Sequence, residues 1–313
     1  MSNSPRPAAY GGENWSPRRA SLRQELGRIW RASGVGSEWS ALKAVLLHRP
    51  GAELETLGDP DSTLMLARPD AVRARRQHDA LAEAYRGSGV EVHYLEPAGT
   101  PPPNQMFVAD LMFMTPEGAL VGRPASTVRA GEERWVARRL ADLGIPILRS
   151  VRGQGTFEGA DAAWLDAETV LLAHGLRTNP EGAAQVAATL TELGVQVIEV
   201  ELPYGTMHMM GTLRIVDRDL AIAWHGRVPF GAVSALRERG FNLLFFPDEA
   251  EAVKGFAHNF VTLGSRRILM PAGRPLSEAF YREAGIACHT VEVDELQKAA
   301  GGIGCLTGIL HRE

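Results

Sequence analysis

Only one of the two cysteines in this 313-residue chain lies in a glycine-rich loop. Cys305 is part of the stretch G-G-I-G-C-L-T-G at 301–308, whose four glycines allow tight turns, positive φ and close approach to a ligand. A free cysteine is usually a small, buried, inert residue, so the loop alone does not predict chemistry. A thiol becomes a nucleophile when a base and charged groups lie beside it. The question is therefore which side chains accompany Cys305.

Three other segments carry side chains that would complete a nucleophilic site. F-E-G-A-D at 157–161 supplies Glu158 and Asp161, and M-H-M-M-G at 207–211 supplies His208. Asp110 precedes an apolar run, where a carboxylate is costly to bury unless it meets a donor or a cation. Taken singly, each has a structural interpretation, as a turn or capping acid or as a satisfied core histidine. Only their combination with the thiol favours a catalytic site.

The charge of this combination predicts the kind of substrate. Several carboxylates around one thiol raise its pKa, which is unfavourable for attack on a neutral carbonyl. A cationic substrate changes this, because the acids bind it and the bound cation favours the thiolate. A guanidinium is planar, permanently charged and suited to bidentate carboxylates. The residue types therefore indicate a guanidine substrate.

Composition limits the remaining functional classes. Hydrophobic residues make up 45% and charged residues 22% of the chain, as in ordinary globular proteins. The net charge of −4 and the pI near 6.2 do not favour nucleic acid or an anionic membrane as partner. The sequence has no apolar run of about 20 residues and no secretory signal, so we expect a cytoplasmic protein. Because the cysteines are not spaced with histidines as zinc ligands would be, no metal is expected.

A repeat explains how distant residues could meet. Five times an amphipathic helical pattern runs into a glycine and then into an apolar strand, and the glycines stand at 89, 144, 194, 240 and 285. Glycine at such a place ends a helix in the left-handed conformation. Further strand-like runs lie between the units, including 212–224 and 261–270. The pattern predicts an α/β fold, a five-bladed α/β propeller with pseudo-fivefold ββαβ repeats, whose central loops bring 110, 158, 208 and 305 together.

An ordinary doubly wound sheet is the alternative, since helix, glycine and strand also recur there. Against it, no strand is followed by a glycine-rich phosphate loop. The N-terminal part differs in composition: 1–20 is rich in Ser, Pro, Gly and Asn, and 21–32 carries an amphipathic helical pattern. We therefore expect residues 1–38 to be a partly disordered extension with one short helix, and residues 39–313 to be a single α/β-propeller catalytic domain.

These motifs resemble the guanidine-modifying superfamily of arginine deiminases, dimethylarginine dimethylaminohydrolases and amidinotransferases. The stretch L-K-A-V-L-L-H-R-P-G at 42–51 resembles the opening strand of deiminases, and Q-H-D-A-L at 77–81 resembles their first helix. P-N-Q-M-F-V-A-D at 103–110 and R-T-N at 177–179 resemble dimethylargininases. F-E-G-A-D is similar to an E-G-G-D element, and the 301–305 loop is similar to the nucleophile loop. The resemblance covers roughly residues 40–313.

The resemblance implies a five-bladed propeller and a role for each matched residue. Cys305 would be the nucleophile, His208 the acid and base, and Glu158 the active-site glutamate that grips the guanidinium. The remaining substrate-binding residues that it implies are Asp110 and Asp161 at the guanidinium, Arg129 and Arg177 at the substrate's α-carboxylate, and Asn104. No metal or organic cofactor is implied.

Three positions depart from the family pattern. Asn104 stands where dimethylargininases have an aspartate, and Ala109 replaces a second acid. Deiminases and amidinotransferases carry H-x-D, whereas here Met210 stands two residues after His208. Fewer acceptors thus remain for guanidine N–H groups, which argues against a deiminase of unsubstituted arginine and leaves the identity of the substrate open.

Three functional hypotheses follow from the sequence. The leading one is a C–N hydrolase that acts on arginine or an N-substituted arginine through a covalent Cys305 thiouronium. The second is an amidinotransferase, in which an amine replaces water as acceptor. The third is a non-catalytic propeller that binds a partner, which would require Cys305, His208 and Glu158 to lie apart. The expected ligand is a small guanidine with a carboxylate, and homo-oligomer formation stays open.

Overall fold

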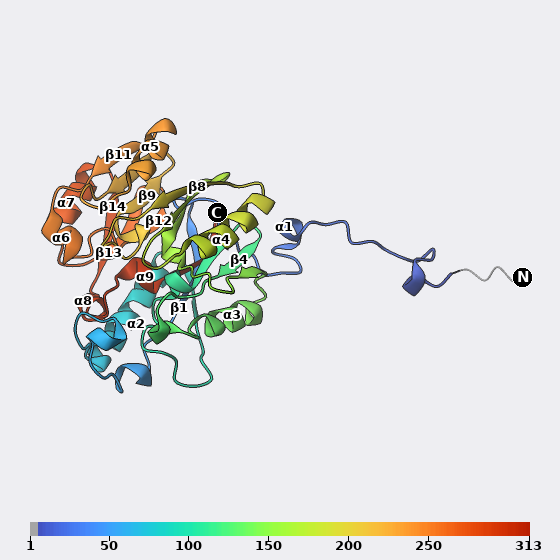
Figure 1. The fold of residues 1–313 in the computed structure, drawn as a ribbon, viewed down its shortest axis with the longest axis horizontal. Coiled ribbons are helices and arrows are strands. Elements are labelled where there is room, and N and C mark those ends of the chain that lie inside the picture. Colours follow the sequence, from blue (N-terminus) through green and yellow to red (C-terminus); the bar gives the residue numbers. More distant parts are fainter. Residues whose placement is uncertain (1–5) are drawn as a thin grey trace, which may run out of the picture.

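Five three-stranded sheets surround a common hub in the computed structural model, which describes residues 6–313 (Figure 1). The sheets are β15 (Gly308–Arg312), β1 (Leu42–Leu47) and β2 (Glu91–Tyr94); β3 (Met112–Thr115), β4 (Gly118–Val121) and β5 (Ile147–Ser150); β6 (Ala162–Asp166), β7 (Thr169–His174) and β8 (Gln196–Glu201); β9 (Leu213–Asp217), β10 (Leu220–Ala223) and β11 (Asn242–Phe245); β12 (Val261–Gly264), β13 (Arg267–Pro271) and β14 (Ala287–Val291). The fold is a five-bladed α/β propeller, and the predicted fold class is confirmed.

Every blade repeats the same ββαβ connection. The first two strands are antiparallel, whereas the middle and outer strands are parallel, which requires a crossover helix between them. These helices are α2 (Ala71–Gly87), α3 (Glu133–Asp142), α4 (Pro180–Glu192), α5 (Phe230–Glu238) and α7 (Pro275–Glu283). The glycines that follow them, at 89, 144, 194, 240 and 285, all have φ between +69° and +79°, so each turns the chain from helix into outer strand as predicted.

The propeller closes by pairing strands that are far apart in the sequence. β15 lies antiparallel to β1, with Leu46 opposite Gly308 and Leu42 opposite Arg312. Segment 34–35 adds to this closure, because Gly34 N–H donates to Leu310 O at 3.0 Å and Val35 N–H donates to Thr115 O at 3.2 Å. Residues just before β1 therefore cross the hub between the first two blades.

A short turn precedes the first strand of each blade, on the side of the hub where the site lies. These turns are η4 (Val108–Leu111) before β3, η6 (Gly159–Asp161) before β6, η7 (Met209–Gly211) before β9, segment 256–260 before β12, and α9 (Ile303–Leu306) before β15. The remaining short elements are η1 (Ala8–Tyr10), α1 (Leu22–Glu25), η2 (Ala52–Leu54), η3 (Asp61–Thr63), η5 (Thr127–Arg129), α6 (Glu249–Val253) and α8 (Asp294–Gln297). Each blade thus presents one turn to the centre.

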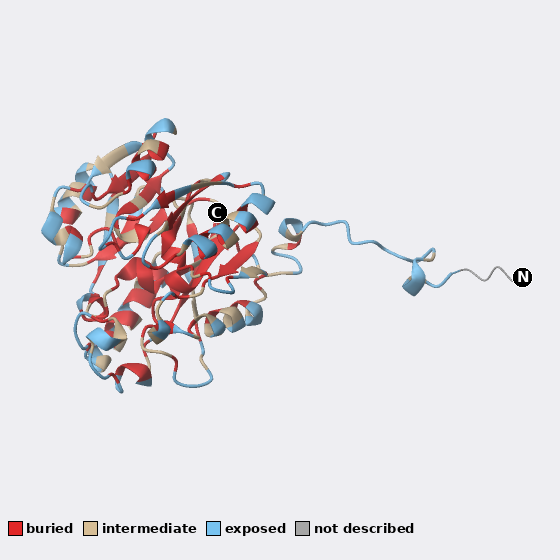
Figure 2. Cartoon of the chain, in the orientation of Figure 1, coloured by how far each residue is buried: buried red, intermediate tan, exposed pale blue. Residues whose placement is uncertain are grey.

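The buried residues gather on the strands and the central turns, while the outer helix faces are exposed (Figure 2). Trp164 on β6 is fully buried, stacks on Phe113 with ring centroids 5.8 Å apart, and donates its indole N–H to Met114 O at 3.0 Å. It links the second and third blades. No helix within residues 6–313 is long and apolar enough to cross a membrane.

The N-terminal helix is shorter than the sequence pattern predicts. The amphipathic pattern extends over 21–32, but α1 ends at Glu25 because Gly27 takes a left-handed conformation with φ +77° and turns the chain. Ile29, expected on the apolar face, is 70% exposed. The arm from Arg6 to about Ala20 projects away from the propeller and is exposed (Figures 1 and 2). Residues 1–5, part of the expected disorder, lie outside the described residues.

Candidate active site

Four of the five central turns carry the residues that the sequence singles out, and the fifth carries one that it missed. Asp110 lies on η4, Glu158 and His208 immediately precede η6 and η7, and Cys305 lies on α9. Ligand atoms of Asp110, Glu158 and His208 lie within 4.8 Å of one another. The repeat therefore brings together side chains about 50 residues apart in sequence.

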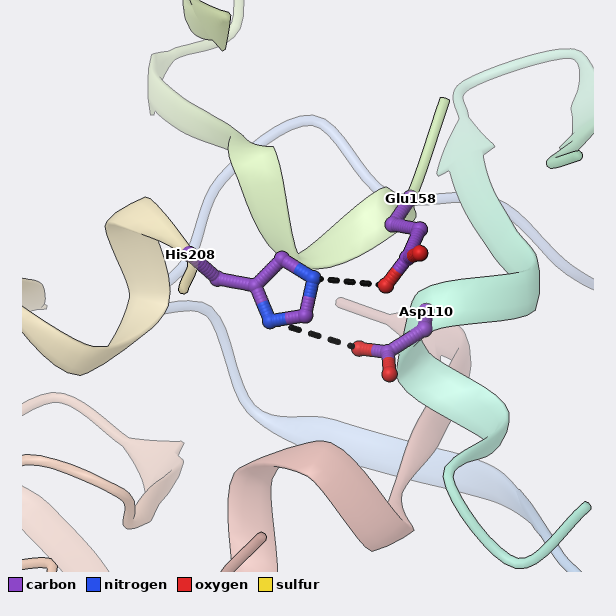
Figure 3. A group of neighbouring side chains, drawn as sticks. All are labelled: Asp110, Glu158 and His208. Atoms are coloured by element: carbon purple, nitrogen blue, oxygen red, sulfur yellow. Dashed lines mark hydrogen bonds and ion pairs between the residues drawn. The ribbon is translucent and has the colours of Figure 1, made fainter. Parts of the chain in front are cut away.

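Glu158 and Asp110 each lie next to one ring nitrogen of His208 (Figure 3). The Nε2 atom of His208 lies 2.7 Å from Glu158 Oε2, and its Nδ1 atom lies 3.9 Å from Asp110 Oδ1. Burial disfavours the charged imidazolium, but the surrounding carboxylates, Asp110 foremost, outweigh burial and raise the pKa of His208 to about 9. At neutral pH the imidazole is therefore protonated and able to donate a proton.

Arg129 connects the carboxylates of the site. Its Nη1 atom donates to Asp110 at 2.7 Å and to Glu158 at 3.1 Å, and its Nε atom donates to Glu132 at 2.9 Å. Burial of Glu158 opposes its ionisation, but Arg129 and His208 outweigh burial and hold the pKa of Glu158 well below its usual range. Without substrate, Arg129 thus contacts the same acids that the family resemblance assigns to the substrate's guanidinium.

Cys305 is held by a residue that sequence reasoning missed. Asn259, in the turn before β12, donates from Nδ2 to the Cys305 sulfur at 2.9 Å and accepts from the Cys305 N–H at 3.2 Å. Burial, with a further contribution from Asp110, raises the pKa of the Cys305 thiol to about 11, against the opposing effects of Asn259 and the Gly302 N–H. Because Asn259 occupies the fifth turn of the repeat, the period of about 50 residues was the signal that could have found it.

The glycines of the nucleophile loop are needed for close packing. A Cβ atom on Gly301 would lie 2.2 Å from the Phe107 ring, and one on Gly304 would lie 2.8 Å from Asn259 Oδ1. The positive φ expected of this loop belongs instead to Ala300, at +71°. Larger residues at 301 or 304 would therefore displace the groups that position the thiol.

One pocket joins most of the predicted substrate-binding residues to Cys305, the predicted nucleophile. Its lining consists of Cys305, Asp110, Arg129, Arg177 and Asn104 with Leu64, Phe107, Met207, Ala299, Ala300 and Gly301. Arg177 is buried and lies 3.4 Å from Glu158, whereas Asn104 donates from Nδ2 to Thr63 O at 2.8 Å. Asn104 thus fixes the turn next to Leu64, which forms part of the pocket wall.

Asp161 faces away from this pocket. Its carboxylate accepts from the Thr178 hydroxyl at 2.7 Å and from the Met209 N–H at 3.0 Å, and burial raises its pKa to about 6. These bonds join R-T-N to the turn that carries His208. The geometry favours a positioning role for Asp161 over the direct substrate contact that the sequence predicts.

Glu132 is a second residue that the sequence analysis missed. It is fully buried, binds Arg129 from one turn away, and has a pKa raised by burial to about 7. The only signal for it in the sequence is its spacing of three residues from Arg129. An acid so close to an arginine is common on protein surfaces, so the spacing alone does not predict a buried pair.

The acids and the imidazole would also offer ligand atoms to a metal ion. Arg129, however, bonds to both carboxylates, and the imidazole between them is protonated at neutral pH. A divalent ion would have to replace two positive groups that are already hydrogen-bonded. The charge arrangement is thus better suited to an organic cation than to a metal.

Comparisons with known proteins bear on the family of this chain. A family model described as "N,N dimethylarginine dimethylhydrolase, eukaryotic" matches residues 69–307. The N(G),N(G)-dimethylarginine dimethylaminohydrolase of Streptomyces coelicolor is 29% identical over 234 residues, covering 75% of this chain and 84% of the relative. That of Pseudomonas aeruginosa is 26% identical over 242 residues, covering 77% and 90%.

A solved structure gives the same fold. A cysteine-to-serine variant of the Pseudomonas aeruginosa enzyme in complex with citrulline superposes with a TM-score of 0.73 at 24% identity, covering 87% of this chain and all of that chain. The resemblance drawn from the sequence motifs is confirmed. Because the family match spans well over half of its residues, this chain belongs to the N,N-dimethylarginine dimethylhydrolase family of the guanidine-modifying superfamily.

Proposed function

We propose that this protein is a cysteine-dependent hydrolase that cleaves a guanidine C–N bond of arginine or an N-substituted arginine. The observation that supports this most directly is the pocket in which Cys305 shares the lining with Asp110, next to an imidazole that Asp110 and the other carboxylates around it keep protonated. A nucleophile, a proton donor and acids for a cation are thus combined in one place. The related dimethylarginine dimethylaminohydrolases support the same class of reaction.

Substrate binding begins with an exchange of cations. The substrate guanidinium takes the positions at Asp110 and Glu158 that Arg129 Nη1 occupies, while Glu132 retains Arg129 through its Nε atom. Arg129 and Arg177, both in the pocket lining, then bind the substrate's carboxylate. The exchange keeps the buried acids paired throughout, which avoids the cost of leaving a buried charge without a partner.

The chemical steps follow from the protonation states. The thiol loses its proton to solvent, and the thiolate attacks the central guanidinium carbon. His208 gives its proton to the departing nitrogen, the C–N bond breaks, and a cationic thiouronium remains on Cys305. His208 then removes a proton from water, and the resulting hydroxide attacks the same carbon. The C–S bond breaks and the new hydroxyl group loses its proton to solvent, which gives citrulline and the thiolate.

The test is replacement of the nucleophile. Cys305→Ser is expected to lower citrulline formation from arginine, monomethylarginine and dimethylarginine by at least about 1,000-fold, while Cys288→Ser, at the partly buried second cysteine, retains activity. Trapped thiouronium of matching mass on the wild-type peptide containing Cys305 would support the covalent step. Undiminished turnover of the true substrate by Cys305→Ser would show that Cys305 is not the nucleophile.

The same covalent intermediate serves an amidinotransferase, so products must be compared. With arginine and water alone, a hydrolase forms citrulline. Ornithine that appears only when a second amine is added would instead establish transfer to that amine.

We also expect turnover to survive dialysis against a chelator, since each proposed step uses only side chains of this chain. Loss of activity that zinc or manganese restores would contradict this.

A further inference from the structure

A second cavity lies inside the hub, behind the turns that carry the active site. It has a volume of about 70 Å³ and is lined by first strands of the blades, including Met112, Trp164 and Ile215. Gly304 and Thr307, which flank Cys305 and Leu306 in the sequence, also belong to its lining. Within the described residues, the two cavities have no lining residue in common.

Two arginines reach this hub cavity from different blades. Arg214 on β9 donates from Nη2 to Phe260 O at 2.6 Å, with its guanidinium carbon 5.3 Å from the centre of the Phe260 ring. Arg312 on β15 donates from Nη1 to Ser40 O at 2.8 Å and is only 7% exposed. Each arginine has five N–H groups, so both retain donors for another acceptor.

Neither arginine has an ionic partner. Across residues 6–313, no carboxylate oxygen lies within 4 Å of Arg214 or Arg312, and the buried Nε atom of Arg312 has no hydrogen-bond acceptor. Arg214 is half-buried, whereas Arg312 is buried; an arginine buried as far as Arg312 is normally paired, because an unpaired buried charge is costly. The orphaned Nε atom therefore points to an acceptor that the protein itself does not provide.

A single acid shares the cavity. Glu38 Oε1 accepts from the backbone N–H of Trp164 at 3.2 Å, and Glu38 lines the same space. Burial lowers the pKa of Arg312 to about 10, and Glu38 only partly opposes this effect. Two cations, Arg214 and Arg312, and one anion, Glu38, leave one net positive charge in a space of about 70 Å³. This charge suits a monoanion, whereas a cation would meet two guanidinium groups and a dianion would exceed the net charge.

We propose that the hub cavity binds a compact monovalent anion, such as a halide or formate, between Arg214 and Arg312. A water molecule takes up about 30 Å³ in the liquid, so the cavity has room for such an ion and one or two waters. The ion supplies the acceptor for the Arg312 Nε–H and neutralises the excess charge. Binding requires neither Cys305 nor catalysis, so the proposal stands or falls independently of the hydrolase function.

Bromide is the probe, because it can be located by anomalous X-ray scattering. Crystals of the full chain grown with sodium bromide are expected to show an anomalous peak in the hub cavity within hydrogen-bonding distance of both guanidinium groups. Data from crystals in sodium gluconate, whose anion is too large for the cavity, provide the comparison. A cavity that holds only non-anomalous water at high bromide would overturn the proposal, and this readout needs no variant.

Thermal unfolding gives the second readout. At constant ionic strength, exchange of gluconate for bromide is expected to raise the melting temperature saturably, by about 2–4 °C at a tenfold excess over Kd. Arg312→Met, which keeps an unbranched apolar side chain but removes the guanidinium group and its charge, should abolish the rise. Arg237→Met, on the exposed face of α5, should keep it. If Arg312→Met does not fold, Arg214→Met replaces it; an equal rise in a hub variant and in wild type would contradict the site.

Discussion

The two ends of the hub are built from the same repeated strands and turns, but they treat charge in opposite ways. At the pocket end, Arg129 lies within 3.1 Å of three carboxylates, and the protonated imidazole lies between two of them. In the hub cavity, Arg214 and Arg312 have no carboxylate within 4 Å among the described residues. The fold therefore does not determine the charge pattern; the single residue that each turn or strand contributes does.

The comparison also shows why the pocket end suits a cation. Its acids are already arranged around a guanidinium, that of Arg129, so a substrate guanidinium meets preformed partners. Preorganised partners save the cost of arranging charges when the ligand binds. In the hub cavity the arginines are preformed donors in the same sense, but for a negative ligand.

The largest effect is expected from removing one negative charge at the pocket end. Asp110→Asn leaves Arg129 and the substrate cation with one acid fewer, and breaking one partner of a buried ion pair costs about 3–5 kcal/mol. We expect kcat/KM for the guanidine substrate to fall at least about 100-fold, as measured by citrulline formation at pH 7.5.

Asp217→Asn, at the end of β9, is the control substitution matched to Asp110→Asn. Asp217→Asn also breaks an Asp–Arg pair, with Asp217 Oδ2 lying 2.7 Å from Arg266 Nε, but in a hairpin near the surface. Its kcat/KM should stay within about twofold of wild type, because neither residue lines the pocket and the Arg266 side chain is 39% exposed to solvent. Equal losses in the two variants would mean that the charge at Asp110 has no special role.

The next largest effect is expected from substitution of Asn259, the residue of the fifth turn that the sequence analysis missed. Asn259→Ala removes the hydrogen bond to the Cys305 sulfur, which for a charged thiolate is worth about 1.5–3 kcal/mol. We expect kcat to fall about 10- to 100-fold with little change in KM, because Asn259 does not line the pocket. The alkylation profile of Cys305 should also move to higher pH.

That shift separates positioning of the thiol from general damage to the fold. Asn242→Ala, on the exposed edge of β11, controls for loss of an asparagine and should leave both kcat and the alkylation profile unchanged. If Asn259→Ala lowered kcat but left the pH dependence of alkylation unchanged, the hydrogen bond to sulfur would not be the cause.

The last prediction concerns the ionisation of Cys305 and His208 in the free enzyme. With the pKa of Cys305 raised to about 11, the thiolate fraction rises about tenfold per pH unit from pH 7, so alkylation by neutral iodoacetamide should accelerate likewise. The pKa of His208, about 9, limits its proton-donating form to lower pH. We therefore expect kcat/KM to rise up to about pH 9 and then level off.

A cationic amidine electrophile should react much faster than a neutral one of equal intrinsic reactivity, because the acids around Asp110 attract it and its charge favours the thiolate. Cys288→Ser protein removes the second thiol from the measurement. Equal rates for the two reagents, with a thiol already ionised at pH 6, would contradict an acid-lined guanidine site.

The sequence predicted those features that recur. Five glycines after five helices predicted the blades, since a left-handed residue is needed each time a helix turns into an outer strand. The same period predicted that Asp110, Glu158, His208 and Cys305 would meet. The sequence analysis did not single out Asn259, although the period places a turn there, because an asparagine next to apolar residues has no chemical signature of its own.

Features that depend on tertiary packing could not be predicted. The orientation of Asp161 depends on bonds to Thr178 and Met209, which come from different turns. Glu132 looks like a surface acid in the sequence because its burial is decided by Arg129 and the neighbouring blade. The amphipathic pattern at 21–32 predicted a helix that the left-handed conformation of Gly27 ends early.

The closing strand has a consequence for the order in which the enzyme gains activity. Cys305 and β15 belong to one short segment, and β15 pairs with β1, which emerges from the ribosome more than 250 residues earlier. The acids and the imidazole are synthesised before this segment, so during translation the incomplete propeller carries a cation-binding cluster without its nucleophile. A chain that stops before this segment lacks the proposed nucleophile together with the strand that closes the ring of blades.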